Sequence, residues 1–235
     1  MTHVQHAFPA VGGENLSASE SEQAWSDFTQ MQGCHLIELR SHEAIYYDGD
    51  PASRVYEVVE GAVMLYKLLP DGRRQVVDIL KSNDLFGYPA DDIYDCSAES
   101  LTGATIRSMD RAQVESRAQL QFHLNRGLRR QLQDLHEHTV LLGRKSAFER
   151  VASFLMRFVP NRGGNGCAGP RGKKDDWDIV LAMTRQEIAD FLGLTIETVS
   201  RVLSEMKRRE LIRIEKQDRI YMRRVCDICK HTGIH

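Results

Sequence analysis

The chain has 235 residues, of which 42% are hydrophobic and 27% charged, with a net charge of −2. That length predicts one large or two small domains with a sizeable core. The sequence contains no apolar run of the roughly 18 to 20 residues that a membrane-spanning helix needs, so we expect no membrane contact. No Lys or Arg precedes Arg40, so the basic start of a secretory signal peptide is missing. We therefore expect a cytoplasmic protein whose five unevenly spaced cysteines stay reduced.

The charge is divided unevenly along the chain. Residues 1–110 hold 7 Lys and Arg against 18 Asp and Glu, a net charge of −11. Residues 111–235 hold 24 against 15, a net charge of +9. Because a basic half attracts polyanions, this asymmetry favours a nucleic-acid-binding module joined to an acidic module of another kind.

The N-terminal half predicts a flexible arm followed by a β-domain. Residues 1–22 show no sustained period, which is typical of a flexible arm. Residues 23–110 carry short β-rich runs, separated by glycines that supply positive φ in tight turns. These glycines are Gly49, Gly61, Gly72 and Gly87. Their spacing of 11 to 15 residues predicts a small β-barrel or jelly roll.

Residues 111–143 predict a long helix. Apolar residues recur there in steps of three and four, which is close to the heptad seam of paired helices. The seam consists of Leu124, Leu128, Leu132, Leu135, Thr139 and Leu142. This pattern favours a homodimer formed by two copies of the helix. The alternative is that the stripe packs on the chain's own β-domain.

Residues 144–225 contain a helix-turn-helix pattern. Thr184 and Glu187 have the spacing of a capping box that starts a helix, and Gly193 ends that helix. A second helix follows the cap residue Thr195. A short helix, a tight turn and a second helix form the geometry that presents the second helix to the major groove of DNA.

The second helix has an apolar face and a polar face. The residues expected to pack inward are Ile196, Val199, Leu203 and Met206. On the polar face, Glu197, Ser200 and Arg201 follow a helical spacing. Arg donates two hydrogen bonds to guanine and Glu accepts from cytosine, so this face has the chemistry to read a G·C pair. The alternative is an ordinary solvated face with a Glu to Arg ion pair.

Basic residues surround this helix. Nine Lys and Arg lie between residues 201 and 224 against four acidic residues, an excess that phosphate contacts explain. We expect Lys207 and Arg213 to contact DNA phosphates. The run LIRIEKQDRIYM, with two β-rich segments around a polar turn, predicts the hairpin of a winged helix.

The stretch TRQEIADFLGLTIETVSR resembles the helix-turn-helix of CRP/FNR-family transcription regulators, and the resemblance covers nearly the whole chain after the arm. It implies an α+β fold with an N-terminal cyclic-nucleotide-binding-type β-barrel (jelly roll), a long dimerisation helix and a C-terminal winged helix-turn-helix. The segment ETVSR is similar to the FNR and FixK branch, whose recognition helix has Glu, Ser and Arg at the positions of Glu197, Ser200 and Arg201.

The resemblance also implies a target and partners. The target is an inverted repeat close to TTGAT-N4-ATCAA in double-stranded DNA, read by a homodimer. The residues implied to contact phosphates as in relatives are Thr184, Arg185, Gln186 and Thr198. Activators of the family contact RNA polymerase, and the FixK-like subgroup implies control of genes for low-oxygen respiration or nitrogen metabolism.

The residues argue against three ligands that the family offers. Where cyclic-nucleotide binders carry a phosphate-binding Arg, this chain has Cys96 in an acidic neighbourhood that repels an anion. Cys34 and Cys96 are too few for an iron–sulfur cubane, and the arm lacks the cysteine cluster of FNR. His35 and His42 are candidate haem ligands, but nine scattered histidines make such a match common. We expect no cofactor. The open alternative is a regulator of the same fold gated by a small ligand or haem in the barrel.

Residues 226–235 are expected to form a disordered tail. They contain Cys226, Cys229, His231 and His235, four side chains of metal-binding type. Structural zinc sites separate their ligand pairs further along the chain, so a metal site is the less favoured interpretation. Because the chain has no phosphate loop, nucleophile elbow or HExxH pair, we expect that it is not an enzyme.

Overall fold

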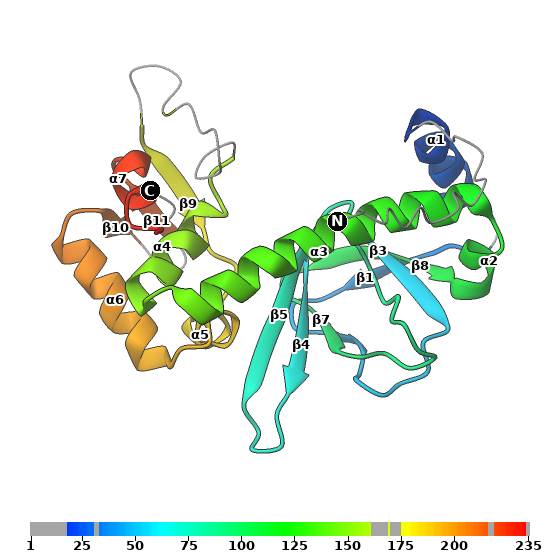
Figure 1. The fold of residues 1–235 in the computed structure, drawn as a ribbon, viewed down its shortest axis with the longest axis horizontal. Coiled ribbons are helices and arrows are strands. Elements are labelled where there is room, and N and C mark those ends of the chain that lie inside the picture. Colours follow the sequence, from blue (N-terminus) through cyan, green and yellow to red (C-terminus); the bar gives the residue numbers. More distant parts are fainter. Residues whose placement is uncertain (1–17, 31–32, 161–168, 170–174, 216–218, 234–235) are drawn as a thin grey trace, which may run out of the picture.

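The computed structural model describes residues 18–30, 33–160, 169, 175–215 and 219–233. It consists of an N-terminal β-domain, a long helix that runs along this domain, and a helix-rich C-terminal domain at the far end of the helix (Figure 1). This arrangement confirms the predicted fold class.

The β-domain contains two four-stranded antiparallel sheets. The strands are β1 (His35–Leu39), β2 (Ala44–Tyr46), β3 (Arg54–Glu60), β4 (Ala62–Leu68), β5 (Arg74–Lys81), β6 (Leu85–Phe86), β7 (Ser97–Ser100) and β8 (Ala104–Asp110). Their order is β1-β8-β3-β6 in one sheet and β2-β7-β4-β5 in the other, as in a jelly roll. The predicted turn at Gly61 joins β3 to β4 with φ +85°, and an added Cβ there would lie 2.5 Å from the Gly103 carbonyl oxygen.

Aromatic side chains pack between the two sheets. Tyr46, Tyr56, Phe86 and Tyr94 are buried, and the rings of Tyr46 and Tyr94 stack with their centroids 3.7 Å apart. Burial raises the pKa of both Tyr46 and Tyr94, so their hydroxyls stay neutral. The rings therefore form a packed, uncharged core within the β-domain.

A helix covers part of the segment predicted to be a flexible arm. The prediction for residues 1–22 is wrong at its C-terminal end, because α1 (Ala18–Thr29) begins there. The residues before Ala18 lie outside the described residues. Trp25 and Phe28 are buried, and the Trp25 ring stacks on His123 of the long helix with the centroids 4.4 Å apart. Burial of these two aromatic side chains explains why the segment is ordered.

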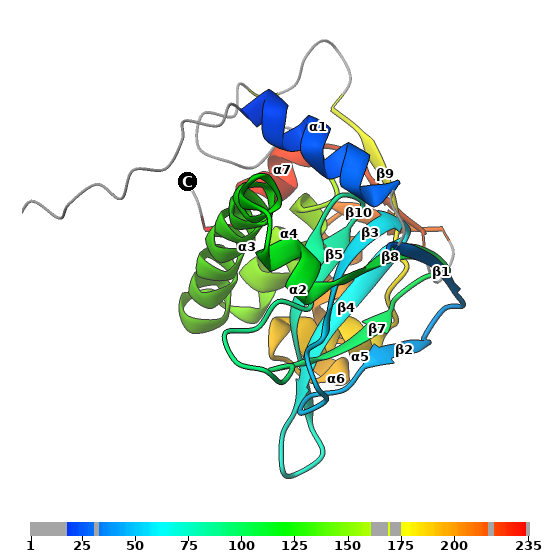
Figure 2. The ribbon, with the colours of Figure 1, turned by 90° about the vertical axis from the view of Figure 1, so that its right-hand side faces the viewer.

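The helix predicted over residues 111–143 is divided in two. A short α2 (Arg111–Glu115) is followed by α3 (Ala118–Arg144), which continues to the C-terminal domain. The Ser116 hydroxyl donates a hydrogen bond to the Gln113 carbonyl, and such local bonds compete with helix continuation. Figure 2 shows α3 close to end-on, with the β-sheets on one side of it.

The C-terminal domain is a winged helix-turn-helix. Its elements are α4 (Ala147–Met156), β9 (Trp177–Val180), α5 (Arg185–Leu192), α6 (Ile196–Arg208), β10 (Ile212–Ile214), β11 (Arg219–Met222) and α7 (Val225–Cys229). The antiparallel pair β10 and β11 confirms the predicted hairpin, and β9 adds a third strand beside β11 that the sequence does not predict. The helices pack around buried rings that include Phe154 and Phe191.

The prediction of a disordered tail over residues 226–235 is wrong for its described part. Ile228 and Cys229 lie on α7 and are buried in the domain core, which α7 joins by packing against α4. Thr232 is also buried, and its hydroxyl donates to the Cys229 carbonyl at 2.7 Å. Val225, Ile228 and Cys229 share one side of the helix, so their burial holds the chain end on the domain.

Candidate nucleic-acid interface

The first helix of the helix-turn-helix begins and ends as predicted. The Thr184 hydroxyl accepts a hydrogen bond from the Glu187 backbone nitrogen at 3.2 Å, and the Glu187 carboxylate accepts from the Thr184 nitrogen at 2.7 Å. This capping box satisfies backbone donors of the first turn. The helix ends at Gly193, whose φ of +59° is the left-handed conformation that favours glycine. The chain therefore turns tightly into α6.

The second helix, α6, is capped by Thr195, whose hydroxyl accepts from the Thr198 nitrogen at 3.3 Å. The predicted inner residues Val199, Leu203 and Met206 are buried, together with Val202, which was not among the predicted ones. The prediction for Ile196 is wrong because its side chain is 38% exposed. Ile196 is the first residue of the helix and lies at the edge of the buried stripe.

The three predicted base-reading residues, Glu197, Ser200 and Arg201, are exposed on the side of α6 that faces away from the core. Hydrogen bonds from its own backbone nitrogen and from the Thr195 hydroxyl hold the pKa of the Glu197 carboxyl below its ordinary value. An ionised carboxylate only accepts hydrogen bonds and a guanidinium only donates them. The face therefore offers the acceptor that cytosine needs and the donors that guanine needs.

The predicted phosphate-contacting residues of the helices differ in exposure. Thr184, Gln186 and Lys207 are exposed, whereas Arg185 and Thr198 are half-buried. Burial lowers the pKa of Arg185, which nevertheless stays a cation at neutral pH. Arg185, Gln186 and Thr198 lie in the first turns of α5 and α6, and Thr184 is the N-cap of α5. Backbone N–H groups at these helix ends also favour a phosphate.

Arg213, on the wing strand β10, is already paired within the chain. One guanidinium nitrogen, Nη2, lies 2.6 Å from Oε1 of Glu215, and the guanidinium lies over the Tyr221 ring at 4.8 Å from its centroid. Since exposed ion pairs are weak, a phosphate can compete with Glu215 for this side chain. Arg213 is therefore a weaker candidate than an unpaired lysine would be.

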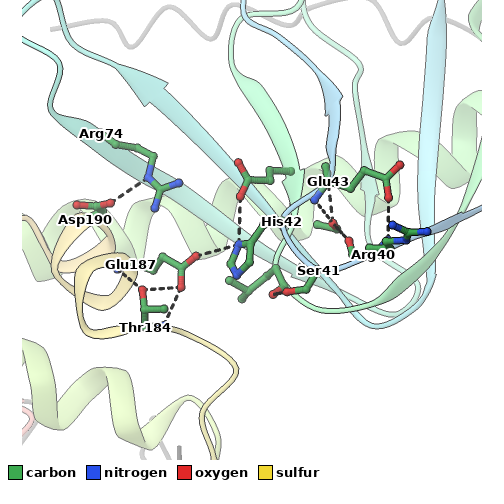
Figure 3. A network of polar contacts seen from close by, with 11 residues as sticks. Arg40, Ser41, His42, Glu43, Arg74, Thr184, Glu187 and Asp190 are labelled. Carbon is green, nitrogen blue, oxygen red and sulfur yellow. Dashed lines mark hydrogen bonds and ion pairs between the residues drawn. The ribbon is translucent and has the colours of Figure 1, made fainter. Parts of the chain in front are cut away.

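Polar contacts join α5 to the β-domain (Figure 3). Arg74 of β5 pairs with Asp190 of α5, with Nε and Oδ2 2.9 Å apart. Nδ1 of His42 lies 3.4 Å from Oε1 of Glu187 and 3.2 Å from Oε1 of Glu99. Glu187 thus caps α5 and also contacts the β-domain. These contacts could not be predicted from local patterns, because their partners lie far apart in the sequence. Arg74 and Asp190, for example, are separated by 116 residues.

The predicted dimer seam on α3 is exposed only in part. Leu132 and Leu135 are 53% and 39% exposed, and Thr139 is exposed as well. Leu124 is only 2% exposed because it packs with α1, and the half-buried Leu128 also contacts that cluster. Leu142 packs against the core of the C-terminal domain. The middle of the seam is therefore free within one chain, while its ends pack on the chain itself.

The candidate metal ligands do not gather into a site. Among the described residues, no group of three or more His, Cys, Asp and Glu could hold a metal ion, although Cys226, Cys229 and His231 are all described. His235 lies outside the described residues.

Burial and the neighbouring Asp95 raise the pKa of Cys96 to about 12, so at neutral pH it is a thiol rather than the thiolate that binds iron.

Two family models match the chain, the cyclic nucleotide-binding domain over residues 36–119 and the Crp-like helix-turn-helix domain over residues 149–227. The nitrogen fixation regulation protein FixK of Rhizobium meliloti is 39% identical over 185 residues, covering 77% of this chain and 80% of the relative. FixK of Bradyrhizobium diazoefficiens is 37% identical over 182 residues, covering 76% and 74%. The chain belongs to the CRP/FNR family.

A solved structure of the same family agrees. FixK2 from Bradyrhizobium japonicum superposes with a TM-score of 0.74 at 32% identity, covering 86% of this chain and 98% of that structure. These relatives place the chain in the FixK-like subgroup of the CRP/FNR family, so it is a DNA-binding transcription regulator and not an enzyme. None of the helices in the described part of the chain is long and apolar enough to span a membrane.

Proposed function

We propose that this CRP/FNR-family regulator is a homodimeric activator that binds an inverted repeat close to TTGAT-N4-ATCAA. The observation that carries the proposal is the exposed face of α6, where Glu197, Ser200 and Arg201 stand free of the core. Arg201 reads guanine and Glu197 reads the cytosine of one G·C pair, and Ser200 helps to read an adjacent A·T pair.

Contacts to the DNA backbone fix the register of this reading face. We assign them to the N-terminal end of α5, with the N-cap Thr184, Arg185 and Gln186, and to Thr198 in α6. Because they are cations, we also assign phosphate contacts to Lys207 near the end of α6 and to Arg213 on the wing. Phosphate contacts add affinity without sequence preference, so these residues serve all DNA sequences alike.

The dimer is formed by the exposed middle of α3. Leu132, Leu135 and Thr139 supply its seam, because they are exposed in the single chain and follow the spacing of paired helices. A dimer places two recognition helices in successive major grooves, about 34 Å apart, which matches a palindromic site.

The relatives suggest which genes the protein controls and where it acts. FixK names a regulator of nitrogen fixation, so we propose target genes of nitrogen metabolism or low-oxygen respiration, contact with RNA polymerase, and action in the cytoplasm, where the chromosome lies. The stacked rings of Tyr46 and Tyr94 between the sheets support binding to DNA without haem or another ligand in the barrel.

The test is a fluorescence-anisotropy titration of the purified chain without added ligand at about 0.15 M salt. We expect binding in the range of about 10 nM to the palindrome, and binding at least about a thousandfold weaker to a scrambled duplex. Equal binding to both duplexes contradicts the proposed site. Addition of haem to a chain that does not bind then tests the ligand-gated alternative.

A further inference from the structure

A cavity of about 260 Å³ lies where the β-domain, α3 and the C-terminal domain meet. Its walls come from β5, from α3, from α4 with the residues after it, and from the segment that precedes α5. The cavity is somewhat smaller than the roughly 300 to 1,000 Å³ of sites for drug-sized ligands, so it is suited to one small molecule.

Most of the cavity wall is apolar. It includes Ile79 and Leu80 of β5, Phe154 of α4 and Met183 of the segment before α5. Phe158 and Val180 also line it, and both are large apolar side chains exposed to solvent. An occupant with an apolar body would cover these surfaces, and removal of apolar area from water favours binding.

The polar part of the wall has more carboxylates than cations. Asp78, Asp84 and Asp134 face the cavity against Lys81 and Arg157. The Asp78 side chain is only 9% exposed, and one of its oxygens accepts a hydrogen bond from the backbone nitrogen of Ile79 at 2.8 Å.

The surroundings of the buried Asp78 and the half-buried Asp84 disfavour the charged form of both carboxyl groups. Burial is the largest influence that raises the pKa of Asp78, and the nearby charges of Asp134 and Asp84 raise it further against the effect of Arg157. Burial also raises the pKa of Asp84, with Asp134 contributing. A cation bound between these groups would relieve this repulsion.

The arrangement of the side chains also indicates which type of cation the cavity accepts. No three acidic, His or Cys side chains of the described residues lie close enough to hold a metal ion, which disfavours an inorganic cation. Arg157, one of the two cations of the wall, lies over the ring of Phe191, which does not line the cavity. The distance between its guanidinium carbon and the ring centroid is 5.1 Å. We propose that this cavity binds a small organic cation, an ammonium or amidinium group carried on an apolar ring or chain.

The position of the site gives the occupant contacts with both domains at once. Asp78 belongs to the β-domain, Asp134 to α3 and Met183 to the segment that leads directly into Thr184 of α5. A ligand that contacts both sides stabilises the arrangement it binds. The binding itself does not rest on the proposed DNA-binding function, so its test needs no DNA.

The test uses the full chain and three probes of similar shape: phenethylammonium, the neutral 2-phenylethanol and the anionic 3-phenylpropionate. Binding is measured by isothermal titration calorimetry, and the methyl NMR signals of Ile79 and Met183 report whether the probe enters the cavity. The variants are Asp78→Asn, Asp134→Asn and the control Asp71→Asn, a carboxylate on the exposed hairpin between β4 and β5.

We expect phenethylammonium to bind at least about tenfold more tightly than the two other probes and to shift both methyl signals. Asp78→Asn and Asp134→Asn should each weaken it about three- to tenfold, and Asp71→Asn should leave it unchanged. The inference is overturned if the ammonium does not bind at about 10 mM, if the three probes bind alike, or if the control variant loses as much as the cavity variants.

Discussion

His138 on α3 is a buried histidine whose replacement should change how stability depends on pH. Its side chain is 7% exposed, its ring lies tilted against the ring of Phe191 with the centroids 4.3 Å apart, and neither ring nitrogen has a hydrogen-bond partner among the described residues. Burial, with a smaller contribution from Arg157, lowers its pKa to about 4. The neutral ring is therefore the form that the folded chain holds.

The sign of the effect follows from the lowered pKa. The unfolded chain binds a proton at His138 near pH 6.5, whereas the folded chain does so only near pH 4, so stability falls as the pH falls through this window. The full difference of 2.5 pKa units between these two values corresponds to about 3 kcal/mol. About 2 kcal/mol of it is lost between about pH 8 and pH 5.

On acidification from about pH 8 to pH 5, we therefore expect the unfolding free energy of His138→Phe to fall by about 2 kcal/mol less than that of the wild type. The variant should also be more stable than the wild type at pH 8, by about 1 kcal/mol, because it removes an unpaired polar group from the interior. The assay is urea denaturation at equal protein concentration. The control is His136→Phe, which replaces an exposed histidine on the same helix. If His138→Phe and the wild type lose equal stability on acidification, the reasoning is refuted.

Three further substitutions test the fold and the dimer. Leu132→Glu should convert the dimer into a monomer at about 10 µM, as measured by sedimentation velocity, because it places a charge in the exposed seam. Arg74→Ala and Asp190→Ala should show a coupling of about 1 to 3 kcal/mol in a double-mutant cycle of unfolding free energy, since the ion pair is largely shielded from solvent. Gly193→Ala should cost about 1 to 2 kcal/mol by urea denaturation because of its left-handed backbone, whereas Gly143→Ala in α3 should not destabilise.

Each of these predictions has a result that contradicts it. Gln133→Glu adds the same charge at the next position of α3, so monomers from both variants would argue against a specific seam. A coupling near zero would mean that the contact between Arg74 and Asp190 does not hold α5 on the β-domain. Equal effects of the two glycine substitutions would contradict the strained turn at Gly193.

Local sequence signals predicted the helix-turn-helix with its boundaries. Thr184, Glu187, Gly193 and Thr195 act through hydrogen bonds and backbone conformation within a few residues, so their spacing alone identifies the two helices. The exposed face with Arg201 follows from the same helical period. The family resemblance supplied the order of the domains, which the relatives confirm.

Features that depend on contacts between distant segments could not be predicted. Leu124 has the spacing of a dimer seam, but it is buried in one cluster with Trp25 of α1, and no local pattern relates the two. The order of the C-terminal segment likewise depends on packing of Ile228 against the domain core. The contact between His42 and Glu187 and the cavity at Asp78 also arise only when the β-domain and the C-terminal domain meet.

The most direct test of base reading by α6 combines a protein substitution with a base-pair substitution. The wild type and Arg201→Ala are titrated against TTGAT-N4-ATCAA and against a duplex in which the G·C pair of each half-site is replaced by A·T. We predict that the wild type discriminates between the duplexes by about 1 to 3 kcal/mol for each G·C pair and that Arg201→Ala loses this discrimination. If Arg201→Ala weakens binding to both duplexes equally and keeps the preference for G·C, Arg201 does not read the base and the account is contradicted.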